Sequence, residues 1–307
     1  FPKIFSKYYT VPDDECQNLL ASLGVVVIKS VGIDIGSSSI KVVEIHSSSK
    51  SDQIYQYFEH PLDLTPAKDT QLDIIEYLRN LFSQYDKTQT RFVLGFSQNQ
   101  VVTRLLKFPF KDKNKINKAL GFALEDLIPF PSEKTIFDSK FVQSNESESE
   151  VLTCSVLKDE VEKLMSFSKD IGVDPHILSA EGFAYANLIE NWKAPVQAPA
   201  SSDLLEEARS QITVYLHLGH SRTVLTAYKN NILITARSLS WGGRSIAENI
   251  AKKYEIPFIE AIKELKTKGF VLISPQGASK DQVVFSELIS KSLKDLIIEY
   301  KEVLLGK

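Results

Sequence analysis

Cysteine and methionine are scarce in this sequence, and long apolar runs are absent. The two cysteines, Cys16 and Cys154, are too few for a disulfide framework and stand in no metal-ligand spacing, so a reducing cytoplasm is the expected compartment. No apolar run reaches the roughly 18–20 residues that a helix needs to cross a bilayer. The first residues, Phe1 to Ile4, lack the basic flank and the small-residue cleavage site of a signal peptide.

Charge of one sign is also lacking. The 36 basic and 39 acidic residues give a net charge of −3, so no overall basic field favours nucleic acid as a partner. The five histidines form no His-Glu-x-x-His or His–Cys spacing, and no Gly-x-Ser-x-Gly elbow occurs, so zinc catalysis and a serine hydrolase are disfavoured. With 43% hydrophobic residues, the composition is that of an ordinary globular protein and excludes disorder and fibrous repeats.

Hydrophobic periodicity predicts alternating strands and helices along most of the chain. Period-two patterns predict strands, and apolar residues at helical spacing predict helices. The expected strands are 31–35, 40–45, 53–59, 91–96, 101–108, 137–143 and 151–157, and the expected helices are 70–85, 116–127, 161–171, 182–192, 247–254 and 283–305. Residues 1–28 fit poorly with this pattern and are expected to be an extension, a docking arm or a fused segment. Residues 193–202, rich in Ala and Pro, are the expected linker.

After this linker the first pattern of the chain returns. Residues 214–228 can be laid over residues 31–45, so that Asp34 matches His217, Gly36 matches Gly219 and Ser38 matches Ser221. Both copies read as a strand, a Gly-Ser turn and a second strand. This duplication predicts two related halves, each with a mixed sheet flanked by helices, and a ligand cleft between them.

The first turn, Gly36-Ser37-Ser38-Ser39, has the composition of a phosphate-binding turn. Gly36 lets the backbone approach a ligand closely, and the N–H and hydroxyl groups of Ser37, Ser38 and Ser39 can ring an anion. Lys41 can bring a positive charge to the same phosphates, and Asp34 can hold magnesium through water. On local spacing alone, a plain hairpin with a Gly-Ser turn is the favoured interpretation, but the second copy of the turn shifts the balance towards a clamp on one phosphate chain.

These residues carry a family resemblance. The run Val31 to Lys41 resembles the first phosphate loop of the actin-like ATPase superfamily, and most closely its PilM/GspL branch, which is related to FtsA. Three further stretches are similar to that branch in the same order: Ala119 to Pro131 with its Ile-Pro-Phe-Pro end, Ser179 to Trp192, and Ala236 to Ile246 with its Gly-Gly turn.

The resemblance implies an α/β, actin-like (ribonuclease H-like) fold with two duplicated halves and a small inserted α+β subdomain. The implied domains are 29–103 for the first subdomain, 104–180 for the insert and 181–307 for an incomplete second half. The implied cofactors are ATP and magnesium. The implied binding residues are Asp34, Gly36, Ser37, Ser38, Ser39 and Lys41 on the first turn and Gly219, Ser221, Gly242 and Gly243 in the second half, with Asp34 as the metal ligand.

Three departures from the family pattern argue against ATP hydrolysis. His217 stands where the second phosphate loop normally carries Asp, and an imidazole cannot replace a carboxylate that organises magnesium and water. Ile262 stands where an acidic residue normally holds the nucleoside. The chain ends at Lys307, before the Gly-Gly adenosine loop that the family usually adds. We therefore expect His217 to be a half-buried strand residue and nucleotide binding to be weak or absent.

The resemblance then implies a scaffold rather than an enzyme. We expect a component of a bacterial inner-membrane platform, either for type II secretion (GspL-like) or for type IV pili (PilM-like), with the GspL-like interpretation favoured by the degenerate site. The implied partners are the N-terminal domain of a GspE-like secretion or pilus ATPase and the short cytoplasmic tail of a PilN-like membrane protein. A homodimer is a further candidate, and the expected location is cytoplasmic, at the inner membrane. The alternative is a true nucleotide-binding ATPase or filament protein of the PilM/FtsA type.

Overall fold

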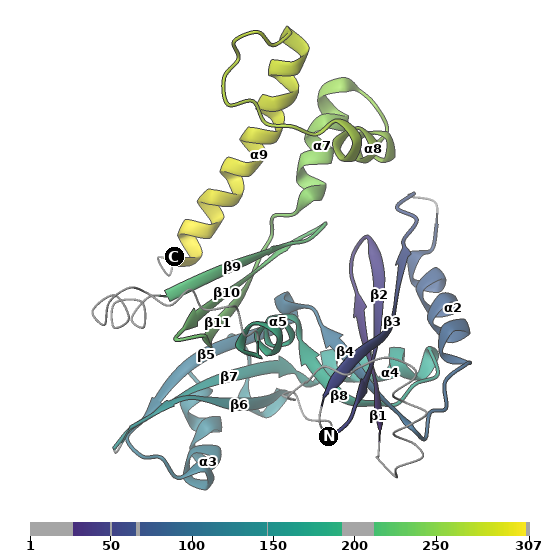
Figure 1. Cartoon of the computed structure of the whole chain (residues 1–307). Helices are drawn as coiled ribbons and strands as arrows, with labels where there is room; N and C mark the ends of the chain where they lie inside the picture. The colour runs from purple at the N-terminus through teal and green to yellow at the C-terminus, as the bar shows by residue number, and fades with distance from the viewer. Residues whose placement is uncertain (1–26, 50, 66–67, 146, 192–211, 305–307) are drawn as a thin grey trace.

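The computed structural model describes residues 27–49, 51–65, 68–145, 147–191 and 212–304. The proposed extension at 1–28, except for its last two residues, and the proposed linker at 193–202 lie outside these ranges, as does Cys16. The described chain forms three sheets and a helical cap. In Figure 1 the cap lies at the top of the view and the sheets lie below it.

The first sheet has five strands in the order β3-β2-β1-β4-β8. Strand β1 pairs antiparallel with β2, which pairs antiparallel with β3, whereas β4 runs parallel to both β1 and β8. The strands are β1 (Ile28–Ile35), β2 (Ser39–Ser47), β3 (Asp52–Pro61), β4 (Thr90–Phe96) and β8 (Pro175–Ala180). Helices α2 (Thr70–Phe82) and α4 (Lys158–Asp170) cover this sheet with Leu78, Phe82 and Val161 in its core, and Arg79 of α2 donates to the carbonyl oxygen of Asp170 at 2.9 Å.

A buried carboxylate on β2 interacts with side chains from both neighbouring strands of this sheet. Glu44 on β2 is 1% exposed and accepts hydrogen bonds from Gln56 at 2.7 Å and from the Tyr85 hydroxyl at 2.9 Å. His46 and Lys29 lie 2.5 Å and 3.3 Å from the same carboxylate. Burial opposes its ionisation, but the hydrogen bonds from His46, Gln56 and Tyr85 lower the pKa of Glu44 below its usual value.

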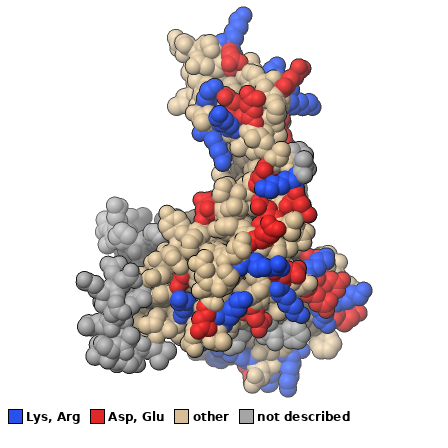
Figure 2. Space-filling view, turned by 90° about the vertical axis from the view of Figure 1, so that its right-hand side faces the viewer, with Lys and Arg blue, Asp and Glu red and all other residues tan. Residues whose placement is uncertain are grey.

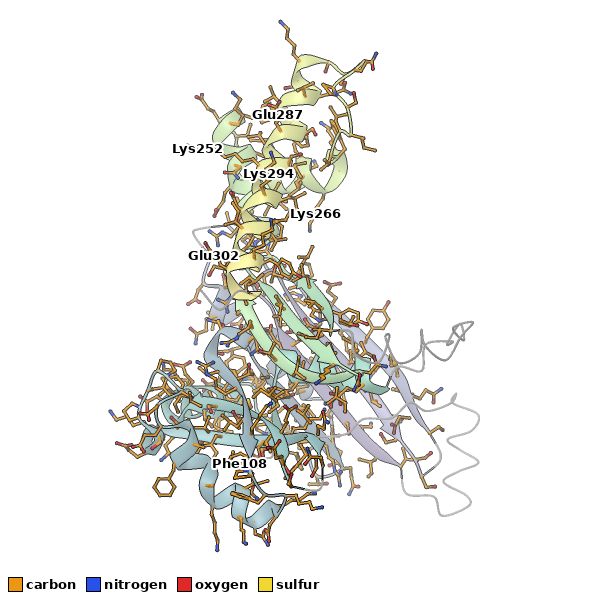
Figure 3. The ribbon with its side chains drawn as sticks, turned by 90° about the vertical axis from the view of Figure 1, so that its left-hand side faces the viewer. Phe108, Lys252, Lys266, Glu287, Lys294 and Glu302 are labelled. Atoms are coloured by element: carbon orange, nitrogen blue, oxygen red, sulfur yellow. The ribbon has the colours of Figure 1, made fainter. Side chains whose placement is uncertain are left out.

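The inserted subdomain has a three-stranded antiparallel sheet in the order β5-β7-β6. It consists of η1 (Gln98–Gln100), β5 (Val101–Phe108), α3 (Lys113–Leu124), η2 (Ser132–Lys134), β6 (Thr135–Ser144) and β7 (Ser149–Leu157). Asp112 caps α3 by accepting from the N–H groups of Asn114 and Lys115, and Ile116, Leu120 and Leu124 face a core that also contains Phe108 (Figure 3).

This architecture differs from the expected insert at 104–180 at both ends. The sheet of the insert begins at Val101, and β8 does not belong to it, because β8 pairs in parallel with β4 and forms an edge of the first sheet. The reason is chain topology: α4 returns the chain from β7 to the first sheet, so β4-insert-α4-β8 is one long parallel crossover.

The second half contains α5 (Glu181–Asn191), a three-stranded sheet and the helical cap. The sheet has the order β11-β10-β9 and consists of β9 (Ile212–Leu218), β10 (Thr223–Lys229) and β11 (Ile232–Leu239). The cap consists of α7 (Gly243–Tyr254), α8 (Phe258–Lys268) and α9 (Lys280–Leu304), which share a core of their own around Trp241, Ile250 and Leu296.

Charged side chains of both signs cover the surface of the molecule. Lys252, Lys266, Glu287, Lys294 and Glu302 project from the three cap helices (Figure 3). Lys, Arg, Asp and Glu are interspersed over the face shown in Figure 2, without a large area of one sign. None of the helices in the described ranges is both long and apolar enough to cross a membrane.

Candidate functional site

The two repeated turns face one cleft. In the first turn the Gly36 N–H donates to the Ser39 carbonyl at 3.1 Å, and in the second the Gly219 N–H donates to the Arg222 carbonyl at 3.0 Å. The cleft between them has a volume of about 370 Å³. It is lined by Asp34, Gly36, Ser37, Ser38, Ser39 and Lys41 from the first copy and by His217, Gly219, His220, Ser221 and Arg222 from the second. The structure therefore brings together all the predicted residues except Gly242 and Gly243.

Close packing within each turn accounts for its glycine. A Cβ atom on Gly36 would lie 2.9 Å from the Ser39 carbonyl oxygen, and one on Gly219 would lie 2.6 Å from the Arg222 carbonyl oxygen. At such distances a side chain would force the backbone of the turn to shift, so the turn favours glycine in both copies.

Gly242 and Gly243 contact the backbone of the second turn. A Cβ atom on Gly242 would lie 2.3 Å from the His220 carbonyl oxygen, and the Gly243 N–H donates to the Gly219 carbonyl at 3.0 Å. The Arg244 N–H donates to the His220 carbonyl at 2.8 Å. These glycines therefore position the turn instead of lining the cleft.

Acidic groups dominate the first side of the cleft. Asp34 stands opposite Lys41 in the β1–β2 register. Its side chain opens onto the cleft but is surrounded by protein, and this burial raises the pKa of Asp34 against the opposing effect of Lys41. Burial likewise raises the pKa of Glu181, and the charge of Asp34 adds to the effect, although the Gln98 N–H donates to Glu181 at 2.7 Å.

The second side of the cleft carries no carboxylate at the matching position. His217 is half-buried, as expected, and stacks on Tyr185 with the ring centroids 3.7 Å apart and the planes 4° from parallel. Its Nε2 atom lies 3.2 Å from the Thr226 hydroxyl, and burial lowers the pKa of His217, so the ring is neutral at pH 7. Burial raises the pKa of Tyr185 to about 12.

Several residues that line the cleft could not be found from the turn motif alone. Ser97, Glu181, Tyr185 and Arg222 all face it. Arg222 bridges the two halves, since its Nη1 atom donates to the Ser97 hydroxyl at 2.7 Å and also to Asn99. The sequence signal for Glu181 is its place in the stretch Ser179 to Trp192, which resembles the family, just before the predicted helix at 182–192.

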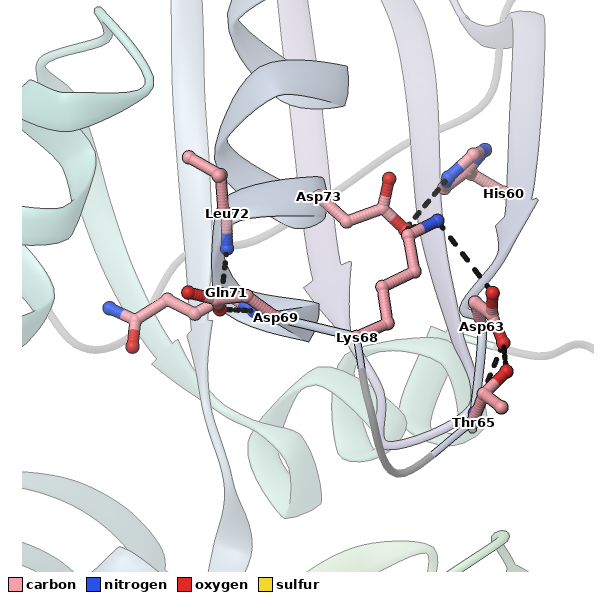
Figure 4. Close-up of polar contacts among 8 residues, drawn as sticks. All are labelled: His60, Asp63, Thr65, Lys68, Asp69, Gln71, Leu72 and Asp73. Carbon is pink, nitrogen blue, oxygen red and sulfur yellow. Dashed lines mark hydrogen bonds and ion pairs between the residues drawn. The ribbon is translucent and has the colours of Figure 1, made fainter.

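A neighbouring pocket continues from the cleft past Ser37 and His220. It is lined by the loop between β3 and α2 and by the start of the cap, where the Arg244 guanidinium lies 5.4 Å from the centre of the Phe258 ring. Figure 4 shows how Lys68 of the loop lies between Asp63 at 3.8 Å and Asp73 at 3.5 Å, while the Asp69 carboxylate caps α2. The charge of Lys68 is therefore balanced by Asp63 of its own loop and by Asp73 of α2.

The cleft fits a phosphate chain better than a metal ion held by protein alone. In the described residues, no group of three or more His, Cys, Asp and Glu side chains gathers as a metal site. Magnesium typically keeps several waters and uses one or two carboxylates together with the ligand's own phosphates. Asp34 and Glu181 fit that role, and Lys41 and the serine turn fit the phosphates.

The arrangement of the three sheets and the two facing turns defines an actin-like fold. A solved "PilM-PilN type IV pilus biogenesis complex" shares it, with a TM-score of 0.67 and 18% identity over 90% of this chain and 76% of that one. The cytoplasmic domain of EpsL, an inner-membrane component of the Vibrio cholerae type II secretion system, is less similar, with a TM-score of 0.41 and 10% identity over 75% of this chain and 76% of that one.

The family model "Type IV pilus assembly protein PilM" matches residues 32–271. This chain therefore belongs to the PilM family. The expectation that favoured GspL over PilM rested on losses around the nucleotide site. Those losses concern nucleotide chemistry and do not distinguish the two families, whereas the family match extends over most of the chain.

Proposed function

We propose that this chain is the actin-like scaffold of a type IV pilus assembly platform at the cytoplasmic face of the inner membrane, where it holds the cytoplasmic tail of a PilN-like membrane protein. The observation that supports this most is the family match over residues 32–271. The chain in the PilM–PilN complex has the same fold over 90% of this chain, which is consistent with the proposal. A GspE-like ATPase domain is a second proposed partner, and a homodimer is a further one.

We also propose that the scaffold is not an ATPase. The second turn offers a neutral, stacked His217 where magnesium chemistry needs a carboxylate, and Val224 stands at the position that matches Lys41. Only the first side of the cleft therefore lines it with carboxylates that suit magnesium and with a lysine that suits the phosphates. The alternative, a nucleotide-gated protein, is favoured by Asp34, Lys41 and Glu181 on the first side.

Binding of the tail is tested by fluorescence anisotropy. A labelled peptide with the N-terminal cytoplasmic sequence of a PilN-like protein from the same organism is titrated with the whole chain, and a scrambled peptide serves as the control. Saturable binding of the native peptide alone is expected. Equal binding of both peptides, or of neither by a folded sample, would contradict the scaffold proposal.

The enzymatic alternative is tested with a fluorescent ATP analogue and a phosphate-release assay. The wild-type chain is expected to bind the analogue weakly with magnesium and to release no phosphate above background. His217→Asp restores the second carboxylate, so its affinity for the analogue should rise with magnesium by about tenfold, while His217→Asn, the matched control, should not change it. Stoichiometric phosphate release by the wild-type chain would favour the ATPase.

A further inference from the structure

A second polar cavity lies beside the cleft, between the insert and the second half. Its volume is about 500 Å³, and it shares only Ser221 and Arg222 with the cleft between the turns. Strands β5 and β11 lie side by side here (Figure 1), because the Thr103 hydroxyl donates to the Ala236 carbonyl at 2.7 Å. The cavity is thus formed by contacts between distant parts of the chain.

Three arginines from three different segments line this cavity. They are Arg104 on β5, Arg222 in the second turn and Arg237 on β11. Within the described ranges, none of the three forms an ion pair with a carboxylate. The guanidiniums also repel one another: burial and then the charge of Arg237 lower the pKa of Arg104. The cavity therefore holds positive charge from three side chains, and among the described residues only Arg222 has a charge interaction with a carboxylate, that of Glu181 in the neighbouring cleft.

Neutral groups hold two of these side chains in place. Arg104 donates from Nε to the Leu127 carbonyl at 2.7 Å and from Nη1 to the Thr103 carbonyl at 2.9 Å. Arg222 donates from Nη1 to Ser97 and Asn99. A guanidinium has five N–H donors, and these bonds use two at each residue. No such bond is formed by Arg237 in the described part of the chain, so most of the donors remain for a ligand.

The remaining lining favours an anion with several oxygen atoms. Asn99, Ser238 and Ser240 add an amide and hydroxyl groups to the walls, whereas the amide of Gln98 is already bonded to Gly182 and Ala236. Guanidinium forks match phosphate oxygens in pairs, and such charge-assisted bonds are about twice as strong as neutral ones. We propose that this cavity is a phosphate-binding site, separate from the cleft between the turns, that takes inorganic phosphate or pyrophosphate or the phosphoryl group of a larger ligand.

Isothermal titration of the whole chain with inorganic pyrophosphate tests the site. Arg237 is exposed on β11, so Arg237→Gln should fold normally while removing two or more donors. Its affinity should fall about tenfold or more. Lys229→Gln, which removes a charge from the exposed end of β10, is the matched control and should bind like wild type. Lys41→Gln, which weakens only the cleft between the turns, should also retain this binding. Thermal melts check that each variant is folded.

Equal affinity in Arg237→Gln and Lys229→Gln, or loss of binding in Lys41→Gln alone, would overturn the proposal. Titrations with ADP and with citrate identify the source of the oxyanion. Binding of ADP that Arg237→Gln weakens as much as that of pyrophosphate would support a phosphoryl group of a larger ligand. Citrate bound as tightly as pyrophosphate would show a general carboxylate site and overturn the phosphate assignment.

Discussion

The two turns have the same backbone hydrogen bond but differ in the side chains beside it. Both close with the same hydrogen bond, from glycine N–H to the carbonyl three residues on, and both exclude a side chain at that glycine. However, the first turn is flanked by Asp34 and Lys41, whereas the second is flanked by His217 and Val224. The comparison teaches that a glycine in this motif indicates the conformation of the turn. Only the flanking side chains indicate what the turn can bind.

The largest expected effect concerns the packing of Gly242 against the second turn. Gly242→Val forces a Cβ atom to within 2.3 Å of the His220 carbonyl and should lower the free energy of unfolding by about 3 kcal/mol. Gly243→Ala, where the nearest atom would be 3.9 Å away, is the matched control and should cost less than about 1 kcal/mol. Urea denaturation measures both. Similar losses in the two variants would show that Gly242 is not a packing support.

The turns themselves can be compared by adding a single methyl group to each. Gly219→Ala should destabilise the chain more than Gly36→Ala, because its Cβ atom would approach a carbonyl oxygen at 2.6 Å against 2.9 Å. We expect losses of about 1–2 kcal/mol, measured by the same urea transitions. If Gly36→Ala were instead the costlier change, the first turn would be the more rigid of the two.

The next comparison separates two carboxylates by pH. The pKa of Glu181 is raised in the folded state, so its ionisation destabilises the fold as the pH rises through that raised pKa. Glu181→Gln should therefore raise the melting temperature at pH 7 and change it little at pH 4. A higher melting temperature of Glu181→Gln at pH 7 would indicate that Glu181 serves ligand binding and lowers the stability of the fold.

Glu44→Gln is the opposite case. The pKa of Glu44 is lowered, so its contribution is present above its unfolded pKa near 4.5 and is lost as the pH falls. This variant should destabilise the chain by about 2 kcal/mol at pH 7 and less at pH 4. Melting curves at both pH values measure the two variants. If Glu181→Gln and Glu44→Gln changed the melting temperature at pH 7 in the same direction, the distinction between a carboxylate of the cleft and a structural carboxylate would be wrong.

The turns and the repeat could be predicted from the sequence because they are local. The match of Gly36 with Gly219 needs only the printed order of residues, and the half-buried position of His217 follows from the strand pattern. Residues joined by topology could not be predicted in this way. Glu181 reaches the cleft because β8 pairs in parallel with β4, and the strand pattern does not encode which strands pair. The insert boundary at 180 is implied by the family resemblance, and the hydrophobic pattern predicts no strand at 175–180 that could have corrected it.

One buried side chain connects the insert with two elements of the second half, α5 and β11. Gln98, 1% exposed, accepts from the Gly182 N–H at 3.0 Å, donates to the Ala236 carbonyl at 3.4 Å, and its own N–H donates to Glu181. A Cβ atom on Gly182 would lie 2.4 Å from the Ala236 side chain. Gln98 of the insert therefore holds the start of α5 and strand β11 at the same time. A movement of β11 away from the insert would have to break the bond to Ala236, while the bonds to Gly182 and Glu181 at the start of α5 could remain.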